Sequence, residues 1–244
     1  MNSTAHKQRS QVWAILPVKS IGAAKQRLSG ALSARERRDL FRHMLADVLA
    51  AVRDTKSLDR LLVVTRDPEV KALAEHHRAR IFSTDADDGQ SAAVNAAARM
   101  LSDEGVRRVI TLPGDVPLVT AAEIDAVCDS LETVAAMTIV PNSDETGSNS
   151  IACSPPCAIR FMFGEMSFPR HLREAEQREI ATRVLRLAGL SLDIDVVSDL
   201  VELLRREATT ATQRFLLSSG IASRLEQHGR VAHRATGADG LAIQ

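Results

Sequence analysis

One carboxylate stands out by its surroundings. Asp115 follows the apolar run Val109–Leu112 and lies in a turn that contains Pro113, Gly114 and Pro117. A short run of Val, Ile and Leu predicts a buried strand, and the Pro and Gly residues predict the turn that ends it. Because ligands bind outside the carboxyl ends of strands in open α/β sheets, Asp115 is a candidate ligand for a divalent metal on the phosphates of a nucleotide. The alternative is an aspartate that is simply solvated in a turn.

A second carboxylate is predicted to lie beside the first. Asp195 ends the short apolar segment that begins at Leu192, which we interpret as a strand. Two aspartates at neighbouring strand ends can share one or two Mg²⁺ ions, so Asp115 and Asp195 are the candidate metal ligands. Asp193 shares a face with Asp195 because side chains alternate along a strand, and proximity to the strand end favours Asp195. The alternative for Asp195 is a residue that begins the following helix.

A basic loop follows the first predicted strand, which covers residues 12–18. The loop contains Lys19, Lys25 and Arg27. Binding of a nucleoside triphosphate requires cations, since negative charge accumulates on the leaving pyrophosphate. The chain has no G-x-x-x-x-G-K-S/T motif, so this loop is not a P-loop. The alternative is an ordinary solvated basic loop.

Two small polar loops are suited to an anion. The first covers residues 144–149 and is rich in hydroxyl groups and turn-forming residues. The second covers residues 163–168 and places Gly164 and Ser167 at the start of a predicted helix. Since the free N–H groups and the dipole of a helix N-terminus attract anions, a phosphorylated carboxylic acid would fit between the two loops. The alternative for Ser167 is simple capping of the helix.

Strands and helices are expected to alternate along most of the chain. Strands are predicted at residues 12–18, 61–64, 79–82, 106–112 and 135–140, a short antiparallel strand at 150–153, and extended segments at 184–187 and 192–195. Helices are predicted behind a capping box at residues 33–36 and at residues 69–76, 91–101, 121–131, 167–176, 197–206 and 208–225. This order predicts an α/β fold with a mostly parallel sheet and helices on both faces.

The pattern predicts one domain with an extension at each end. The domain covers residues 12–206, and residues 1–11 form a flexible N-terminal extension. Residues 207–244 form a C-terminal extension that is partly helical and then disordered, because its last stretch is small and polar. It carries no motif, so a chain ending near Glu207 is expected to keep its turnover number.

Composition restricts the classes of partner. Of 244 residues, 31 are Lys or Arg and 31 are Asp or Glu, so the net charge is zero and gives no attraction to nucleic acid or to an anionic membrane. No run of eighteen apolar residues is present, which predicts no membrane span. Cys128, Cys153 and Cys157 lack metal-ligand spacing and are interpreted as reduced thiols of a cytoplasmic protein.

Short motifs of this chain also occur together, in the same order, in a known family. Between residues 12 and 206 they read Pro17-Val-Lys19, Lys25-Gln-Arg-Leu28, Leu112-Pro-Gly-Asp-Val-Pro-Leu118, Asp144-Glu-Thr-Gly-Ser-Asn149, Phe163-Gly-Glu-Met-Ser-Phe-Pro-Arg-His171 and Leu192-Asp-Ile-Asp195-Val-Val-Ser-Asp-Leu200. In this order they resemble the 2-phospho-L-lactate guanylyltransferase family, which also includes enzymes acting on phosphoenolpyruvate or 3-phospho-D-glycerate. Members make the guanylylated precursor of the deazaflavin coenzyme F-420. The resemblance implies a Rossmann-like, nucleotide-diphospho-sugar-transferase-like fold.

The resemblance also implies roles for individual residues. Asp115 and Asp195 would hold Mg²⁺, with Asp115 and Lys25 as the catalytic pair. The residues implied to face GTP are Lys19, Lys25 and Asn95, and those implied to hold the phospho acid are Thr146, Ser148, Gly164 and Ser167. The family usually has Gly where Glu145 stands and a small pair where Glu165 and Met166 stand, which bears on substrate identity more than on reaction type.

The implied reaction needs no general base. The phosphate of the acid attacks the α-phosphorus of GTP and pyrophosphate leaves, and a phosphate nucleophile is already ionised at neutral pH. His171 is therefore interpreted as structural or substrate-orienting. Two rivals stay open, a molybdopterin guanylyl- or cytidylyltransferase-like enzyme and a catalytically silent nucleotide-binding protein. The choice among the three acids stays open as well, and a homodimer is the candidate assembly.

Overall fold

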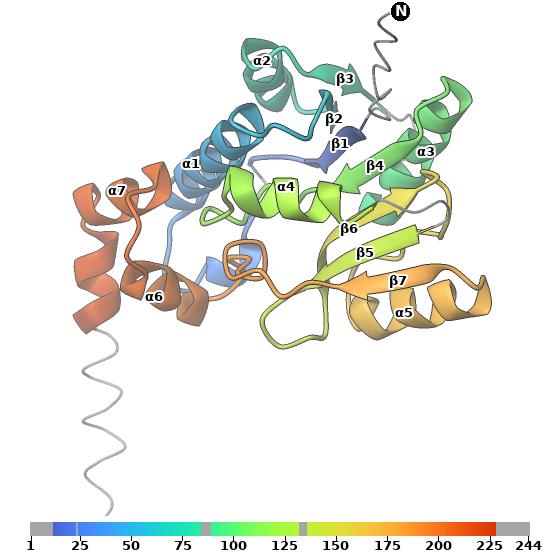
Figure 1. The fold of residues 1–244 in the computed structure, drawn as a ribbon. Helices are drawn as coiled ribbons and strands as arrows, with labels where there is room; N and C mark the ends of the chain where they lie inside the picture. The colour runs from blue at the N-terminus through green and yellow to red at the C-terminus, as the bar shows by residue number, and fades with distance from the viewer. Residues whose placement is uncertain (1–11, 23, 84–88, 132–135, 228–244) are drawn as a thin grey trace, which may run out of the picture.

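A computed structural model describes residues 12–22, 24–83, 89–131 and 136–227 of the chain (Figure 1). Its strands are β1 (Val12–Pro17), β2 (Arg60–Val64), β3 (Arg80–Phe82), β4 (Arg108–Thr111), β5 (Ala136–Pro141), β6 (Ser148–Ser154) and β7 (Ala181–Val184). Its helices are α1 (Ala34–Arg53), α2 (Pro68–His76), α3 (Gly89–Asp103), α4 (Ala121–Asp129), α5 (Ser167–Gln177), α6 (Val197–Arg205) and α7 (Ala211–Ser218), with the short 3-10 helix η1 (Gln26–Leu28).

The strands form one mixed sheet. Its order is β3-β2-β1-β4-β6-β5-β7, and all pairings are parallel except those of β6, which runs antiparallel to β4 and to β5. The prediction of a mostly parallel sheet is therefore confirmed. The antiparallel strand predicted at residues 150–153 lies inside the sheet, where it forms part of β6.

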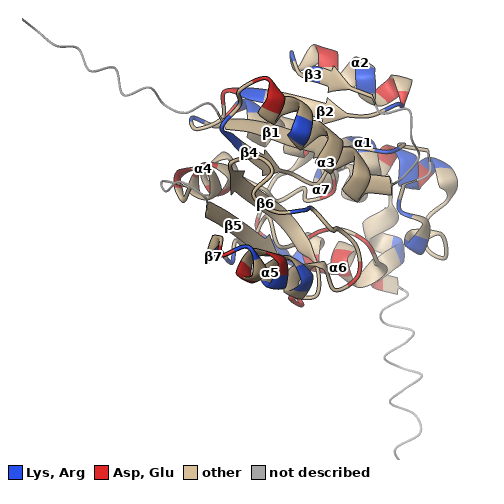
Figure 2. Ribbon diagram, turned by 90° about the vertical axis from the view of Figure 1, so that its right-hand side faces the viewer, with Lys and Arg blue, Asp and Glu red and all other residues tan. Residues whose placement is uncertain are grey.

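Two apolar layers cover the sheet. Side chains of β1 alternate between them, since Ala14 and Leu16 pack against the layer of α1, α4 and α6, while Trp13 and Ile15 pack against the layer that contains α3 and α5. A strand covered on both faces requires a continuous apolar sequence, which explains the run at residues 12–18. Basic and acidic residues are interleaved along helices such as α2 and α5 (Figure 2), in keeping with the zero net charge.

Local signals in the sequence explain where the helices begin. The Ser33 hydroxyl accepts the Glu36 amide at 3.3 Å, and the Glu36 carboxylate accepts the Ser33 amide at 2.8 Å, which completes the predicted capping box of α1. The Asp67 carboxylate caps α2 by accepting the Glu69 amide at 2.8 Å, with Pro68 at the first helical position. No described helix is long and apolar enough to cross a membrane.

Two predicted extended segments differ from the structure. Residues 192–195 are not a strand; the Ile194 amide donates to the Asp115 carbonyl at 3.1 Å, but the segment joins no ladder of the sheet. The alternation of apolar and acidic residues reflects only that Leu192 and Ile194 are buried. The extended segment expected at 184–187 is displaced, since β7 covers Ala181–Val184.

The C-terminal segment is part of the core as far as it is described. The amides of Ala211 and Thr212 donate to Asp47 of α1 at 2.7 and 2.9 Å. Leu216, with Ile221 and Leu225 of the following helical residues 221–227, is buried in the same layer as α1. The helix predicted at residues 208–225 is therefore two helices, α7 and residues 221–227, and both bury side chains in the core formed by residues before the predicted boundary at residue 206. The predictions for residues 1–11 and 228–244 lie outside the described residues.

Candidate active site

A cleft of about 680 Å³ opens at the carboxyl ends of β1 and β4. The segments around it are the β1–η1 loop, the β4–α4 loop, the start of β6, the β6–α5 loop and the segment before α6. The predicted site residues that line it are Lys19, Lys25, Asp115, Thr146, Ser148, Gly164, Ser167 and Asp195. Residues from distant parts of the sequence thus meet where ligands bind in open α/β sheets.

Lys25 joins the two predicted metal ligands. Its ammonium group contacts the carboxylate of Asp115 and lies 2.8 Å from an oxygen of Asp195. Only 5% of the Lys25 side chain is exposed. Burial by itself would lower the pKa of Lys25, but the charges of Asp115 and Asp195 outweigh burial and raise it above its usual value. Lys25 therefore stays a cation, buried between two anions.

The backbone of Lys25 is unusual as well. It lies in the left-handed region, with φ 58° and ψ 41°, which a residue with a side chain adopts at a cost. The following 3-10 turn places the Lys25 side chain toward Asp115. Arg27, in η1, lies 3.5 Å from Asp195 and is largely exposed. The basic loop is thus folded onto the carboxylates.

Asp193 faces the same cleft as Asp195. The amide nitrogen of Asn149 donates to Asp193 at 3.1 Å and to the Leu190 carbonyl at 2.9 Å. Burial raises the pKa of Asp193, and the negative charges of Asp115 and Asp195 raise it further. For Asp195, by contrast, Lys25 and Arg27 outweigh burial and lower the pKa. Asp195 is the better anion, while Asp193 belongs to the same carboxylate cluster.

The donor set fits a magnesium ion. Among the described residues, no group of three or more His, Cys, Asp or Glu side chains is arranged to enclose a metal. Mg²⁺ does not need such a cage in a nucleotide site, since one or two carboxylates suffice when phosphates and water complete the octahedron. Asp115 and Asp195 are close enough to share one cation, that of Lys25.

The part of the cleft formed by β6 and α5 holds a buried polar network. The Ser148 amide donates to the Ser167 hydroxyl at 2.9 Å, so Ser167 links β6 to α5 instead of capping the helix. The Ser148 hydroxyl lies 2.9 Å from Nδ1 of His171, and Nε2 of His171 accepts the Met162 amide at 2.7 Å.

The network fixes the proton positions of His171. Burial, with the nearby charge of Arg170, lowers the pKa of His171 to about 4, so the ring is neutral at pH 7. Since Nε2 accepts a backbone hydrogen bond, the proton is on Nδ1 and is donated to the Ser148 oxygen. The Ser148 hydroxyl then directs its own hydrogen elsewhere and is a donor for an anion in the cleft. His171 therefore orients Ser148, in agreement with the interpretation of the sequence.

The backbone of the polar loops explains why the family usually has small residues at positions 145 and 166. Glu145 and Met166 have φ values of 59° and 52°, a region that glycine adopts most easily. Gly164 has a φ of 111°, and a Cβ built there would meet no described atom within 4 Å, so the chain borders open space. The Glu145 carboxylate binds Arg186 at 2.6 Å and does not line the cleft, whereas Glu165 does.

Two predicted ligands are less available than their positions suggest. The Thr146 hydroxyl donates to Asp144 at 2.7 Å, which leaves Ser148 as the better-oriented donor. Asn95 does not line the cleft; its amide nitrogen donates to the carbonyls of Ser91 and Phe161, and its oxygen accepts the Phe161 amide at 3.0 Å. Asn95 therefore fixes the backbone at Phe161 and does not contribute to the lining of the cleft.

Some residues of the site were not predicted from the sequence. Asn149 lies in the loop predicted to bind the acid. Its neighbours in the sequence do not indicate that its side chain donates a hydrogen bond to Asp193. Gln90 at the start of α3 also lines the cleft. The proximity of these residues arises only when the loops fold together.

The fold is that of nucleotide-processing transferases. A solved structure from Desulfovibrio desulfuricans, described as a nucleotide-diphospho-sugar transferase, has a TM-score of 0.72 at 18% sequence identity, over 89% of this chain and 98% of that chain. The 4-diphosphocytidyl-2C-methyl-D-erythritol synthase of Anaerococcus prevotii has a TM-score of 0.57 at 15% identity, over 81% and 97% of the two chains. At these identities the likeness concerns the fold alone.

Sequence comparison identifies the family. The phosphoenolpyruvate guanylyltransferase of Conexibacter woesei is 36% identical over 77% of this chain and 85% of its own length. The 2-phospho-L-lactate guanylyltransferase of Methanobrevibacter ruminantium is 30% identical over 86% and 92%. The guanylyl transferase CofC-like family matches residues 12–236, and the chain belongs to it. It is therefore a nucleotidyltransferase, as the resemblance implied, and the match continues beyond the boundary predicted at residue 206.

Proposed function

We propose that this protein transfers GMP from GTP to the phosphate of a three-carbon phospho acid and releases pyrophosphate, in the biosynthesis of coenzyme F-420. The candidate acids are phosphoenolpyruvate, 2-phospho-L-lactate and 3-phospho-D-glycerate. An oxygen of the acid's phosphate forms a bond to the α-phosphorus of GTP while the bond between the α-phosphorus and the bridging oxygen of pyrophosphate breaks. No proton has to be removed from the nucleophile at neutral pH, since the second pKa of a phosphate monoester is about 6.

The observation that carries this proposal is the buried Lys25 between Asp115 and Asp195. Phosphoryl transfer depends on positioning and on neutralising charge, and this cluster supplies both signs of charge at one point. Asp115 and Asp195 would hold Mg²⁺, which would neutralise the phosphate oxygens of GTP. Lys25, fixed by the same carboxylates, is placed to stabilise the charge that develops on the transferred group. Lys19 lines the cleft beside it and would contact the nucleotide.

The part of the cleft formed by β6 and α5 is suited to the acid. The Ser148 hydroxyl accepts a hydrogen bond from His171, so its own hydrogen can be donated to the acid. The Ser167 hydroxyl accepts the Ser148 amide and lies beside it. Gly164 adds a backbone that an anion can approach closely, because it borders open space. The first amides of α5 are not available for this, since those of Ser167 and Phe168 donate to the carbonyls of Gly164 and Thr146. Two anions would thus be held in one cleft beside the cluster of Lys25, Asp115 and Asp195, as a transfer between phosphates requires.

The rivals are less well supported. The family match favours a guanylyltransferase over a molybdopterin-type enzyme. A silent nucleotide-binding protein was suggested by Glu145 and Glu165, but Glu145 is paired with Arg186 outside the cleft. Only Glu165 remains near the substrate, and it is exposed.

Pyrophosphate release tests the proposal. The protein is incubated with Mg²⁺, GTP and each candidate acid in turn, with CTP in place of GTP and omission of the acid as controls. We expect release with GTP and one of the acids, and little with CTP. Release with CTP and a different acceptor, or none with any of the three acids, would overturn the assignment.

A further inference from the structure

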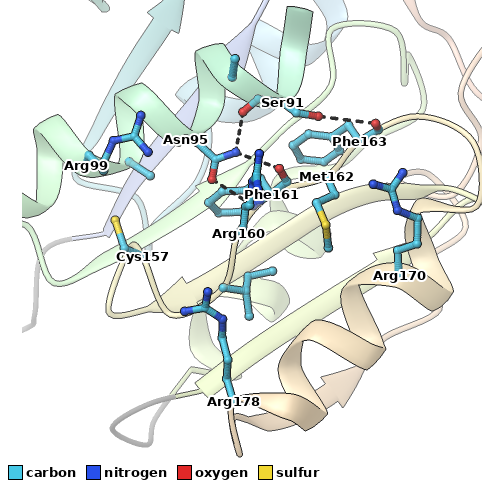
Figure 3. Close-up of a pocket in the computed structure, with 13 residues that line it drawn as sticks. Ser91, Asn95, Arg99, Cys157, Arg160, Phe161, Met162, Phe163, Arg170 and Arg178 are labelled. Atoms are coloured by element: carbon cyan, nitrogen blue, oxygen red, sulfur yellow. Dashed lines mark hydrogen bonds between the residues drawn. The ribbon is translucent and has the colours of Figure 1, made fainter.

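A second pocket lies on the other side of the segment that borders the candidate active site. Its volume is about 660 Å³, and its wall is built by α3, by residues 157–163 and by α5 with the residue that follows it (Figure 3). Phe163 lines both the pocket and the active-site cleft. We refer to this hollow as the arginine pocket.

Four guanidinium groups surround the pocket. They belong to Arg99 of α3, Arg160 of the connecting segment, Arg170 of α5 and Arg178 at its C-terminal end, and Figure 3 shows them around one hollow. No aspartate or glutamate lies among the described residues that line it. The pocket is thus strongly positive in a chain whose net charge is zero.

The guanidinium groups are largely uncompensated. Arg178 binds Glu174 at 2.6 Å. Over the described part of the chain, no carboxylate pairs with the guanidinium groups of Arg99, Arg160 or Arg170, although the Glu174 carboxylate also accepts the backbone amide of Arg160 at 3.4 Å. All four arginines are exposed, so water and salt screen their mutual repulsion, and the guanidinium groups of Arg99, Arg160 and Arg170 are accessible to an anion.

The wall of the pocket is well organised. Asn95 makes three hydrogen bonds to the backbone of Ser91 and Phe161, which fix the segment that carries Arg160. His171 fixes the next amide, that of Met162. Arg99 and Arg170 extend from regular helices on either side. Three elements thus present the cations from a backbone that is already ordered, which lowers the cost of binding a ligand.

The shape and charge indicate the class of ligand. The volume falls within the range of 300–1,000 Å³ or so that is usual for pockets of small molecules. Guanidinium groups bind phosphate oxygens through paired N–H groups, with a geometry that ammonium groups lack. We propose that the arginine pocket binds a small molecule that carries two or more negative charges on phosphate groups. Such an occupant would contact the segment that also bounds the active-site cleft.

Binding of inorganic pyrophosphate tests this proposal. Isothermal titration is carried out on the full chain with EDTA present, so that the carboxylate cluster of the active site has no metal with which to hold the anion. Wild type is compared with the double variant Arg99→Ala/Arg170→Ala. The matched control is Arg173→Ala/Arg183→Ala, which removes two exposed arginines that do not line the pocket.

We expect saturable binding to wild type and to the control, and a dissociation constant at least tenfold higher in the pocket variant. The variant Arg99→Lys/Arg170→Lys keeps the charge and should lie between them, since it loses the paired N–H geometry. Thermal unfolding of each variant shows that it is folded. Equal affinity in the pocket and control variants, or no saturable binding to wild type at millimolar pyrophosphate, would overturn the proposal.

Discussion

The active-site cleft and the arginine pocket have nearly equal volumes, about 680 and 660 Å³, but opposite electrostatic designs. The cleft combines Lys25 with Asp115 and Asp195, whereas the arginine pocket holds cations without lining carboxylates. A site proposed to hold a metal must supply anionic ligands, and a nearby cation then offsets their negative charge. A site that only binds an anion needs cations alone. The two regions share Phe163, so they are separated by a single segment of chain.

The largest effect is expected from a change outside both pockets. A chain that ends after Glu207 lacks Leu216, Ile221 and Leu225, which are buried against α1. Burial of each contributes about 1.5–3 kcal/mol, a large share of the usual 5–15 kcal/mol or so of stability. We expect this chain to unfold and to lose both GMP transfer and pyrophosphate binding, in contrast to the dispensable extension expected from the sequence.

Circular dichroism during heating measures this effect. A chain that ends after Gln227 keeps all described core residues and serves as the control. If the shorter chain melted at the same temperature as the control, the C-terminal helices would not belong to the folding unit.

Substitutions in the carboxylate cluster should affect catalysis in the cleft without changing the arginine pocket. Asp195→Ala removes a proposed metal ligand and a partner of Lys25. We expect a loss of several kcal/mol of transition-state stabilisation, which lowers the turnover number on the order of 10³-fold. Asp193→Ala should be milder, because Asp193 contacts Asn149 and not Lys25. Turnover across a Mg²⁺ titration compares the two variants. A greater loss in Asp193→Ala would reverse their assignment.

His171 should make stability depend on pH. Its pKa is about 4 in the folded chain and 6.5 in the reference state, so the unfolded chain binds the extra proton first as the pH falls. The stability conferred by the neutral ring is present above pH 6.5 and is lost as the pH falls toward about 4, by up to about 3 kcal/mol. Urea unfolding at pH 7 and pH 4.5 measures this difference.

The contribution of His171 is isolated by substitution. His171→Gln should reduce the pH dependence of the free energy of unfolding relative to wild type. An unaltered dependence in His171→Gln would mean that other groups cause it. Loss of affinity for the acid in the same variant would support the role of His171 in orienting Ser148.

The smallest effect is expected at the acid-binding wall. Ser167→Ala removes one hydroxyl that accepts the Ser148 amide, and we expect the KM for the phospho acid to rise by a factor that corresponds to roughly 1–2 kcal/mol. The KM for GTP should change little. Steady-state kinetics with each substrate varied in turn measures both. A rise in the KM for GTP alone would place Ser167 in the nucleotide site.

The strands and most helices could be predicted because their signals are local. The run at residues 12–18 is apolar on both faces, and Ser33 with Glu36 marks a helix start within four residues. The strand predicted at residues 192–195 is wrong, since burial of Leu192 and Ile194 produces the alternation of a strand although no neighbouring strand pairs with the segment.

Functional positions were harder to infer where they depend on contacts between distant segments. Asn95 lies within α3, and nothing in its sequence neighbourhood indicates that its side-chain amide is hydrogen-bonded to the backbone of Phe161. The residues of the arginine pocket come from three elements and form no motif. By contrast, Asp115 and Lys25 could be proposed from the sequence because each lies in a short, characteristic motif.

The turnover of Asp115→Asn at saturating Mg²⁺ tests the central claim most directly, with Arg99→Ala/Arg170→Ala measured beside it. The substitution keeps the size of the side chain but removes the charge that pairs with Lys25 and would bind the metal. We predict loss of pyrophosphate release from GTP and the phospho acid in a folded Asp115→Asn protein, and near wild-type turnover in the pocket variant. Wild-type turnover in Asp115→Asn would contradict the assignment of this cleft as the active site.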